Sequence, residues 1–360
     1  MSRPTRALVN LDALRHNYRL ARSLSGSGQA MPIVKANAYG HGAIAVAKAL
    51  EPLAPALGVA CIEEAVELRD AGVSLPILLL EGFFSDDELE LAAASNFWLM
   101  LQNEYQLQAL AQARLSTPVT CWLKLDTGMH RLGFAPSSAQ ALYEQLHKSP
   151  QVASEIVLAT HLASADDLDK DFTRYQIELF RQHTSGIDAP CSIANSPGLL
   201  GWQDARADWN RPGFMLYGQT PFATPQTAAE KLQPVMTFRS EVMAVREVAS
   251  GESVGYANAW TAQRPSRIAT VPVGYGDGYP RHAENSTPVL INQQRAQLVG
   301  RVSMDMITVD VTDLPGVDIG DEVILWGEQL GANEVAAHAA TIGYEIMTRL
   351  HNRVPRQTVN

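Results

Sequence analysis

The chain has little cysteine. Its 360 residues include three cysteines, Cys61, Cys121 and Cys191, with no CxxC pair and no Cys/His spacing typical of metal ligands. A small and odd number of cysteines excludes a disulfide-stapled secreted scaffold. Each cysteine lies in or beside an apolar run. We therefore expect reduced, mostly buried thiols and no metal site.

Long apolar runs and an excess of positive charge are also missing. No apolar stretch could span a bilayer, and the first residues, MSRPTRALVNLD, lack the apolar core of a signal peptide. The formal net charge of −10 disfavours nucleic acid and anionic membranes as partners. The motifs GxGxxG, GxxxxGKS/T and HExxH do not occur, so nucleotide and zinc sites of those kinds have no support. We expect a cytoplasmic protein.

Apolar runs recur at regular spacing through the first 210 residues. The runs that we read as strands are residues 33–34, 56–60, 76–80, 97–101, 119–125, 156–160, 191–194 and 207–210. Helical patterns separate most of them, for example at 62–71, 86–94 and 172–181. Strands that alternate with helices predict parallel βαβ units, and eight strands are the number that closes a (β/α)8 TIM-type barrel.

A short strand at residues 6–9 precedes these runs, followed by a helix that Asn10 can cap. This ninth strand is surplus to the barrel, and we expect it to pair elsewhere.

The composition and residue pattern of the sequence change near residue 219. Residues 219–234 form a Pro/Thr/Ala-rich stretch that we read as a linker. Alternating strand patterns follow, and a helical segment at about 332–350 closes the chain. We predict an α/β barrel domain in residues 1–230 and a mostly-β domain in residues 231–360, built as a small barrel or sandwich.

The most informative stretch is MPIVKANAYGHG, residues 31–42. A short apolar run ends abruptly at Lys35, a glycine-containing turn with Tyr39 follows, and a helix begins near Ala43. Active residues of barrels sit at the C-terminal ends of strands. An amine placed there can form a Schiff base with a carbonyl compound or with pyridoxal phosphate. A surface lysine that ends a strand is the alternative.

ANSPG, residues 194–198, follows the seventh run. We expect Ser196 to cap a helix whose first residue is Pro197, and a helix start after strand seven often binds phosphate. Gly213, after the eighth run, would allow close backbone approach to the same site. A plain helix cap explains Ser196 equally well.

Two further loops fall at the expected barrel mouth. KLDTGMHRLGF, residues 124–134, offers Lys124, Asp126, His130 and Arg131, and an arginine there can grip a carboxylate with its planar fork. His161 follows the sixth run and can stack on a flat ring. By themselves these residues also fit a solvated loop and a structural histidine.

The second domain contributes the loops VGYANAW (254–260), VGYGDGYPR (273–281) and GRVSMDM (300–306). Without further information, we expect the tyrosines of these loops to pack in the core or against the loops. They are Tyr256, Tyr275 and Tyr279.

Together the motifs resemble those of the alanine racemase family, enzymes that use pyridoxal phosphate and combine a barrel with a β domain. VKANAYGHG, KLDTGMHRLG, HLASAD, ANSPG, RPGFMLYG, VGYANAW, VGYGDGYPR, GRVSMD and the late GYE (343–345) occur in the family's order across nearly the whole chain. The resemblance implies an enzyme that interconverts L- and D-alanine, for peptidoglycan supply or for D-alanine breakdown. It also implies a homodimer with shared active sites.

The resemblance assigns a role to each matching residue. Lys35 would carry pyridoxal 5'-phosphate covalently and serve as one catalytic base, and Tyr256 of the partner subunit would be the opposite base. Other cofactor contacts would be Tyr39, His161, Ser196, Arg211, Gly213 and Tyr344. Arg131 and Met304 would contact the substrate carboxylate. Asp166, Tyr275, Arg281 and Arg301 would line the access corridor.

The chemistry of this assignment is coherent. Two bases on opposite faces can remove and return the α-proton without turning the substrate over. A lysine amine must have a lowered pKa to act as a base at neutral pH. Arg211 stays protonated and cannot protonate the pyridine nitrogen as an acid would. In this family the lysine matching Lys124 can carry a carbamate that orients the arginine matching Arg131.

Three alternatives remain open at this stage. A broader racemase would also accept serine or larger side chains. A decarboxylase of the same architecture would break the bond to the carboxylate, although VGYANAW and Arg211 argue against it. A catalytically idle cofactor-binding protein would not need the β domain.

Overall fold

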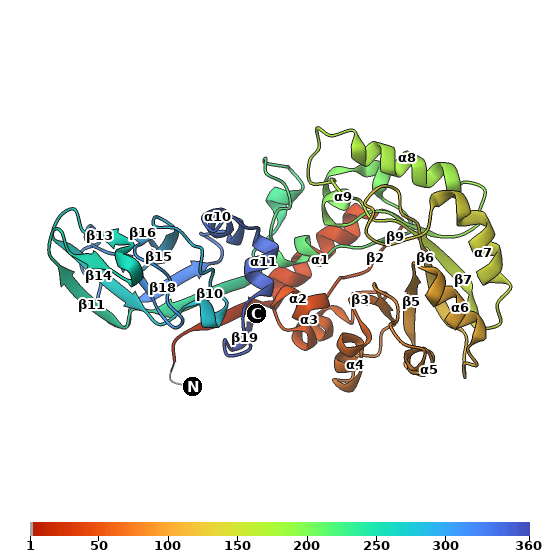
Figure 1. Cartoon of the computed structure of the whole chain (residues 1–360), viewed down its shortest axis with the longest axis horizontal. Coiled ribbons are helices and arrows are strands. Elements are labelled where there is room, and N and C mark those ends of the chain that lie inside the picture. The colour runs from red at the N-terminus through yellow and green to blue at the C-terminus, as the bar shows by residue number, and fades with distance from the viewer. Residues whose placement is uncertain (1–2) are drawn as a thin grey trace.

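The computed structural model describes residues 3–360. Figure 1 shows two parts side by side, a barrel of strands and helices and a sheet-rich part, with the C-terminus at their junction. The described residues contain no helix long and apolar enough to cross a membrane.

The first part is the predicted barrel. Six strands, β3 to β8, form a parallel sheet in chain order, and β2 pairs in parallel with β9. The eight strands are β2 (Gln29–Ala30), β3 (Leu57–Val59), β4 (Ile77–Leu79), β5 (Phe97–Leu101), β6 (Val119–Lys124), β7 (Val152–Ala159), β8 (Cys191–Ser192) and β9 (Trp209–Asn210).

Backbone hydrogen bonds beyond these short strands close the ring. The β2–β9 pair and the six-stranded sheet are joined at both of their edges. At one edge, the Val34 amide donates to the Gly58 carbonyl at 2.8 Å, which joins the segment after β2 to β3. At the other edge, the Arg211 amide donates to the Ala194 carbonyl at 2.9 Å, which joins β9 to β8. Seven of the eight apolar runs overlap the strands β3 to β9, because strands covered on both faces are apolar almost throughout. The first run, 33–34, was placed wrongly: the strand is β2 at Gln29–Ala30, and Ile33 forms only an isolated bridge to Gly58.

Helices surround the strands, as Figure 1 shows. They are α1 (Leu11–Leu24), α3 (Ala43–Leu50), α4 (Ile62–Asp70), α5 (Asp87–Ala94), α6 (Glu104–Gln112), α7 (Ala139–His147), α8 (Phe172–Thr184) and α9 (Ser196–Gly201). Asn10 caps α1 as expected, with its side-chain oxygen accepting from the Ala13 amide at 2.9 Å.

The second part is built on a nine-stranded sheet in the order β11-β14-β17-β16-β15-β18-β10-β1-β19. Its strands after the barrel are β10 (Met236–Glu241), β11 (Ala244–Val248), β14 (Ser266–Val271), β15 (Pro288–Ile291), β16 (Gln294–Leu298), β17 (Ile307–Asp310), β18 (Glu322–Trp326) and β19 (Arg356–Val359). β10 and β11 are six positions apart in the sheet, but only two residues of the chain, 242 and 243, lie between them. The sheet must therefore curl round on itself.

The surplus N-terminal strand belongs to this second sheet. β1 (Arg6–Asn10) pairs antiparallel with β10 and parallel with β19. The chain thus starts in one part and continues at Leu11 into the other. Within residues 219–235, only the 3-10 turn Ala229–Lys231 is regular structure. The domain division at residue 230 stays a prediction.

The expected helical segment at 332–350 is two short helices, which corrects the sequence analysis. α10 (Ala332–Ala337) and α11 (Gly343–Thr348) are separated by a turn in which Ala340 has a φ of 49°. Because this left-handed residue breaks the helical path, α11 can turn toward the barrel.

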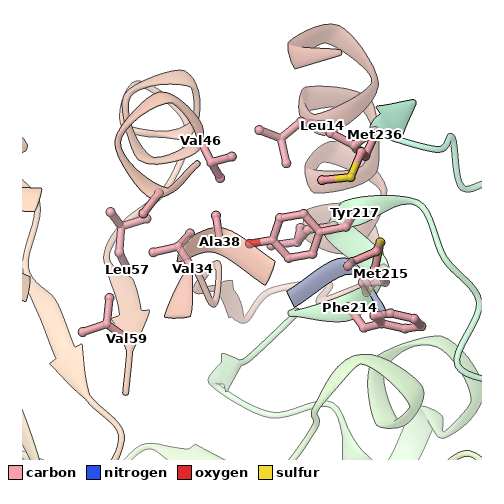
Figure 2. Close-up of a cluster of buried hydrophobic side chains, with 14 of the residues drawn as sticks. Leu14, Val34, Ala38, Val46, Leu57, Val59, Phe214, Met215, Tyr217 and Met236 are labelled. Atoms are coloured by element: carbon pink, nitrogen blue, oxygen red, sulfur yellow. The ribbon is translucent and has the colours of Figure 1, made fainter. Parts of the chain in front are cut away.

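A shared hydrophobic core joins the two parts. Figure 2 shows Leu14 of α1, Val34, Ala38 and Tyr217 together with Met236 of β10. All five side chains are at most 3% exposed and belong to one buried cluster. The site at the barrel mouth therefore rests on residues from both parts of the chain.

Candidate active site

Lys35 begins a short left-handed turn, α2 (Lys35–Tyr39). The next four residues, 36–39, have φ values of 52–53°, although none is glycine. The Ala38 amide donates to the Val34 carbonyl at 2.9 Å, and the Gly40 amide donates to the Ala36 carbonyl at 3.0 Å. A left-handed conformation costs about 1–2 kcal/mol for each residue that has a Cβ atom. We infer that packing around the turn holds it in place.

Contacts from the C-terminal part hold this turn. A Cβ atom on Gly40 would lie 2.0 Å from the Met347 carbonyl oxygen of α11, so only glycine fits there. The Arg356 Nε of β19 donates to the Gly40 carbonyl at 2.9 Å. The Asn37 side chain accepts from the Ala43 amide at 2.8 Å and so ties the turn to the first residue of α3.

A polar niche lies after the last two barrel strands. The Ser196 Oγ accepts from the Gly213 amide at 2.9 Å and from the Met215 amide at 3.3 Å. A Cβ atom on Gly213 would lie 2.6 Å from the Tyr39 hydroxyl oxygen, so glycine lets that hydroxyl reach the niche. The structure therefore brings Tyr39, Ser196 and Gly213 together, in a space with the hydrogen-bonding groups that a phosphate requires.

One detail of this niche differs from the prediction. Asn195, not Ser196, is the N-cap of α9, because its side chain accepts from the Gly198 amide at 3.1 Å. Ser196 is the first helical residue, and Pro197 is the second. The Ser196 hydroxyl is therefore not needed for capping and turns toward Gly213.

Aromatic rings wall the niche. Tyr344 of α11 stacks on Phe214 with ring centroids 3.4 Å apart, and its ring is 6.2 Å from that of Tyr39. Tyr39 in turn stacks on Tyr217 at 4.8 Å. Burial raises the pKa of both the Tyr39 and the Tyr344 phenol. Both hydroxyls are therefore protonated and can donate hydrogen bonds.

Arg211 and His161 form the deep side of the site. The Arg211 guanidinium is buried and donates to the Thr160 carbonyl at 2.5 Å and to the Ser192 hydroxyl. Burial lowers the pKa of Arg211 to about 10, so the group is still protonated at neutral pH. Burial, followed by the positive charge of Arg211, holds the pKa of His161 well below its usual value. The histidine is therefore neutral.

Positive charge gathers around Lys35. Burial lowers the pKa of the Lys35 amine, and the charge of Arg131 lowers it further. Burial lowers the pKa of Lys124 to about 8, helped first by Arg211 and then by Arg131. Lys124, Arg131 and His161 lie together along one narrow pocket. Both lysines therefore lose their proton at a lower pH than a surface lysine does, and for Lys124 this pH is about 8.

Asp126 shapes the loop that carries Arg131. Its carboxylate accepts from the Gly128 and His130 amides, both at 3.0 Å, and pairs with the His130 ring at 3.0 Å. The His130 side chain is 83% exposed. We therefore read His130 as part of the loop's structure.

The remaining predicted site residues lie elsewhere. Tyr256 is 68% exposed, in a turn between β12 (Ser253–Val254) and β13 (Trp260–Thr261). Figure 1 places β13 at the end of the second part that is farthest from the barrel. Met304 is 54% exposed, and its carbonyl accepts from the Gly276 amide at 2.9 Å.

The corridor residues are also at the surface. Arg281 and Arg301 are exposed and line one open groove, and the Arg281 guanidinium lies over the Tyr275 ring at 5.8 Å. Asp166 is exposed near Tyr344, whose pKa its charge helps to raise. One chain therefore assembles the barrel half of the predicted site and leaves the other half exposed.

The sequence analysis missed two carboxylates that organise these loops. Glu64 of α4 accepts from the Ala36 amide at 2.6 Å, directly after Lys35. Asp277, inside VGYGDGYPR, is fully buried and pairs with Arg3 and Arg353. The position of Asp277 in a glycine-rich loop, two residues after Tyr275, was the only sequence signal for its role. No sequence signal pointed to Glu64.

Comparison with known proteins shows that this barrel and curled sheet, with the half-buried Lys35 at a strand end, belong to an isomerase acting on amino acids. The family model described as alanine racemase, N-terminal domain, matches residues 9–221, and that of the C-terminal domain matches residues 235–358. The chain therefore belongs to the alanine racemase family.

Individual relatives agree with this assignment. The chain is 52% identical to a catabolic alanine racemase of Pseudomonas putida, with 99% of each chain covered. It matches the crystal structure of the biosynthetic alanine racemase from Pseudomonas aeruginosa with a TM-score of 0.96 and 46% identity, covering 99% of this chain and 100% of the other. A structure from Bartonella henselae, with covalently bound pyridoxal phosphate, matches with a TM-score of 0.90 and 31% identity over 99% of both chains. The family depends on pyridoxal phosphate.

Proposed function

We propose that the chain racemises alanine by a two-base mechanism with pyridoxal 5'-phosphate. The observation that carries this proposal is the set of cations around Lys35, whose amine has a lowered pKa at a barrel strand end. When bound, the cofactor supplies the electron sink that allows the α-proton of alanine to leave. The Lys35 Nζ removes or returns this proton on one face of the substrate.

The niche around Ser196 fits the phosphate of this cofactor. Tyr39 and Tyr344 supply protonated hydroxyls, and the missing side chain of Gly213 leaves the space that a Cβ atom would fill. Arg211 would face the pyridine nitrogen, and the neutral His161 would pack against the ring. The fixed positive charge of Arg211 would disfavour a proton on that nitrogen, which would make the cofactor a weaker electron sink and so limit transamination.

We propose that the second base is Tyr256 of the partner subunit in a homodimer. Tyr256 is exposed and lies in the turn before β13, a strand at the end of the second part away from the barrel (Figure 1), so a single chain would have one base. Met304 of the partner subunit and Arg131 of the first would hold the substrate carboxylate. Asp166, Tyr275, Arg281 and Arg301 would line the corridor between the subunits.

Lys124 is the residue that we expect to carry a carbamate. A lysine with a pKa of about 8 has a sizeable free-amine fraction at neutral pH, and carbon dioxide reacts with a free amine. The modification would replace a third positive charge beside Arg131 and Arg211 with a negative one. Carbon-13 NMR of the protein in labelled bicarbonate, compared with Lys124→Ala, tests this assignment.

The first test is proton NMR of L-alanine with cofactor-loaded protein in heavy water, followed by chiral separation. A racemase loses the α-proton signal and forms D-alanine. Loss of the signal without D-alanine would mean that only one base works. No exchange at all would favour decarboxylation or an idle binder. L-serine, tested next, distinguishes a strict alanine racemase from a broader one.

Two variants test the two bases and the dimer together. Lys35→Ala should lose the absorbance of the covalently attached cofactor, and Tyr256→Phe should hurt removal of the proton from L-alanine most. Because each would spoil a different half of the shared site, an equal mixture of the two should regain about a quarter of wild-type activity after subunit exchange. No recovery would argue against sites shared between subunits.

The cellular role follows from the same chemistry. We infer a cytoplasmic enzyme that supplies D-alanine for peptidoglycan or breaks it down. Relatives named biosynthetic and catabolic both support the family activity. A D-alanine requirement for growth after gene deletion would indicate supply, and loss of growth on D-alanine would indicate breakdown.

A further inference from the structure

The turn that presents Lys35 needs support from outside itself. Its four left-handed residues, 36–39, each carry a Cβ atom, so the backbone of the turn is strained. Such strain persists only where surrounding contacts fix the backbone. Gly40 and Arg356 anchor the far end of the turn. The end next to Lys35 needs a separate anchor.

Glu64 supplies that anchor with both oxygens of one carboxylate. The Ala36 amide donates to Oε1 at 2.6 Å, and the Ala60 amide donates to Oε2 at 2.8 Å. Ala36 is the residue directly after Lys35, and Ala60 directly follows β3. One side chain therefore ties the turn after the first barrel strand to the connection after the next one.

The position of Glu64 suits an ionised carboxylate. It lies in the first turn of α4, where the positive end of the helix dipole favours negative charge. An amide in its place would have a single acceptor oxygen and would aim an NH2 group at one of the two N–H donors. Burial and then Arg131 lower the pKa of Lys35, and the charges of Glu81 and, to a smaller extent, Glu64 raise it.

We propose that Glu64 is a positioning residue of the reaction, whose bidentate carboxylate locks the Lys35 turn against the end of β3 and so fixes the direction of the Lys35 amine. This inference rests on the proposed role of Lys35. Glu64 does not touch the reacting atoms. It acts through the Ala36 peptide and through its charge.

The test compares Glu64→Gln with Glu67→Gln, an exposed acid one turn further along α4. Hydrogen–deuterium exchange of the cofactor-free protein reports on the turn itself. We expect Glu64→Gln to speed exchange in residues 34–42 at least about ten-fold, because a glutamine accepts from only one of the Ala36 and Ala60 amides and the bridge between them is broken. Acetic anhydride labelling of Lys35 against pH should show a lower midpoint, because the negative charge is gone. Glu67→Gln should change neither.

Kinetics of the loaded enzyme complete the test. With Glu64→Gln, kcat should fall about ten- to a hundred-fold in both directions, with a smaller change in KM, as expected for a misplaced base. Normal exchange and labelling in Glu64→Gln would overturn the inference while the role of Lys35 stands. Normal racemisation by Lys35→Ala would overturn both.

A second variant covers the case in which Glu64→Gln does not fold. Glu64→Asp keeps the charge but is one methylene shorter, so it cannot bridge the Ala36 and Ala60 amides. Faster exchange in residues 34–42 would again support the inference, and unchanged exchange would contradict it.

Discussion

Replacing Asp277 by alanine should destabilise the chain by about 3 kcal/mol. The Asp277 side chain is fully buried and accepts four hydrogen bonds. Arg3 donates twice, at 2.5 and 2.7 Å, Arg353 donates through Nε at 2.7 Å, and the Gly274 amide donates at 2.9 Å. This carboxylate therefore joins both ends of the chain to the loop that carries Tyr275.

The size of the effect follows from what is left behind. Removing one partner of a buried ion pair costs about 3–5 kcal/mol when the other charge stays buried. Here Arg3 and Arg353 are 36% and 37% exposed, so water can hydrate both after the change. The Gly274 amide is left without its acceptor, which costs about 1–3 kcal/mol for a buried group. The lower end of the range, about 3 kcal/mol, is therefore expected.

Asp305 provides the matched control. Its carboxylate binds the same Arg353 at 2.7 Å but is 54% exposed. An exposed ion pair contributes about 0–1 kcal/mol, so Asp305→Ala should have little effect. Urea unfolding followed by tryptophan fluorescence, at fixed protein concentration, measures both variants. Equal midpoints for Asp277→Ala and Asp305→Ala would refute the reasoning.

The pH dependence gives a second measurement. Burial alone would raise the pKa of Asp277, but hydrogen bonds from Arg3 and Arg353 and from the Gly274 amide outweigh it and hold the pKa below its usual value. A lowered folded-state pKa means that the stabilisation is complete above the unfolded value of about 4 and is lost as the pH falls through the folded value. The difference between wild type and Asp277→Ala should therefore be constant near neutrality and shrink below about pH 4.

Three further outcomes are expected. Ala36→Gly should raise the free energy of unfolding by about 0.5–1 kcal/mol in thermal or urea denaturation, because glycine relieves the left-handed strain but makes the unfolded chain more flexible; a loss would mean that Ala36 is unstrained. Asn10→Ala should lower the free energy of unfolding by about 1 kcal/mol, because α1 loses its cap. An unchanged free energy of unfolding would mean that this cap does not stabilise the protein. Burial raises the pKa of Cys61 and of Cys191 to about 11 and raises that of Cys121 further. Iodoacetamide at neutral pH should therefore label these thiols slowly until the chain is unfolded. Fast labelling of the native protein would contradict this.

The barrel could be predicted from sequence because its signal is local. Strands buried on both faces are short apolar runs, and runs such as 97–101 coincide with an observed strand. Lys35 was recognisable for the same reason, since it ends such a run. The helix at 332–350 was predicted as one piece because a left-handed alanine, Ala340, leaves no mark in the residue pattern.

The capping of α9 shows why local rules do not always decide between neighbours. Asn195 and Ser196 are both good N-cap residues. The backbone settles the choice, because Asn195 is extended and its side chain reaches the Gly198 amide. The Ser196 hydroxyl then accepts from the Gly213 amide, 17 residues away. A residue pattern contains no information about that second contact.

The long-range contacts could not be predicted from the sequence for a related reason. Arg3 and Asp277 are 274 residues apart, and Glu64 and Ala36 are 28 apart. Each pair meets only because the fold is complete. Their carboxylates do not react with substrate, so no reactive residue type draws attention to them. Contacts of this kind position the loops that carry Lys35 and Tyr275.

The charge balance of the site ties these observations to the proposed reaction. The whole chain is acidic, with a formal net charge of −10, yet Lys35 and Lys124 lie near two arginines at the barrel mouth. Burial lowers the pKa of Lys124 to about 8, and the neighbouring cations, Arg211 first, contribute to the same shift. Glu81 and Glu64 offset part of this charge at Lys35, and Asp126 offsets part of it at Lys124. In the proposed reaction, a substrate carboxylate, a cofactor phosphate and a carbamate on Lys124 would offset more. The same imbalance that favours these anions keeps the Lys35 amine able to accept a proton.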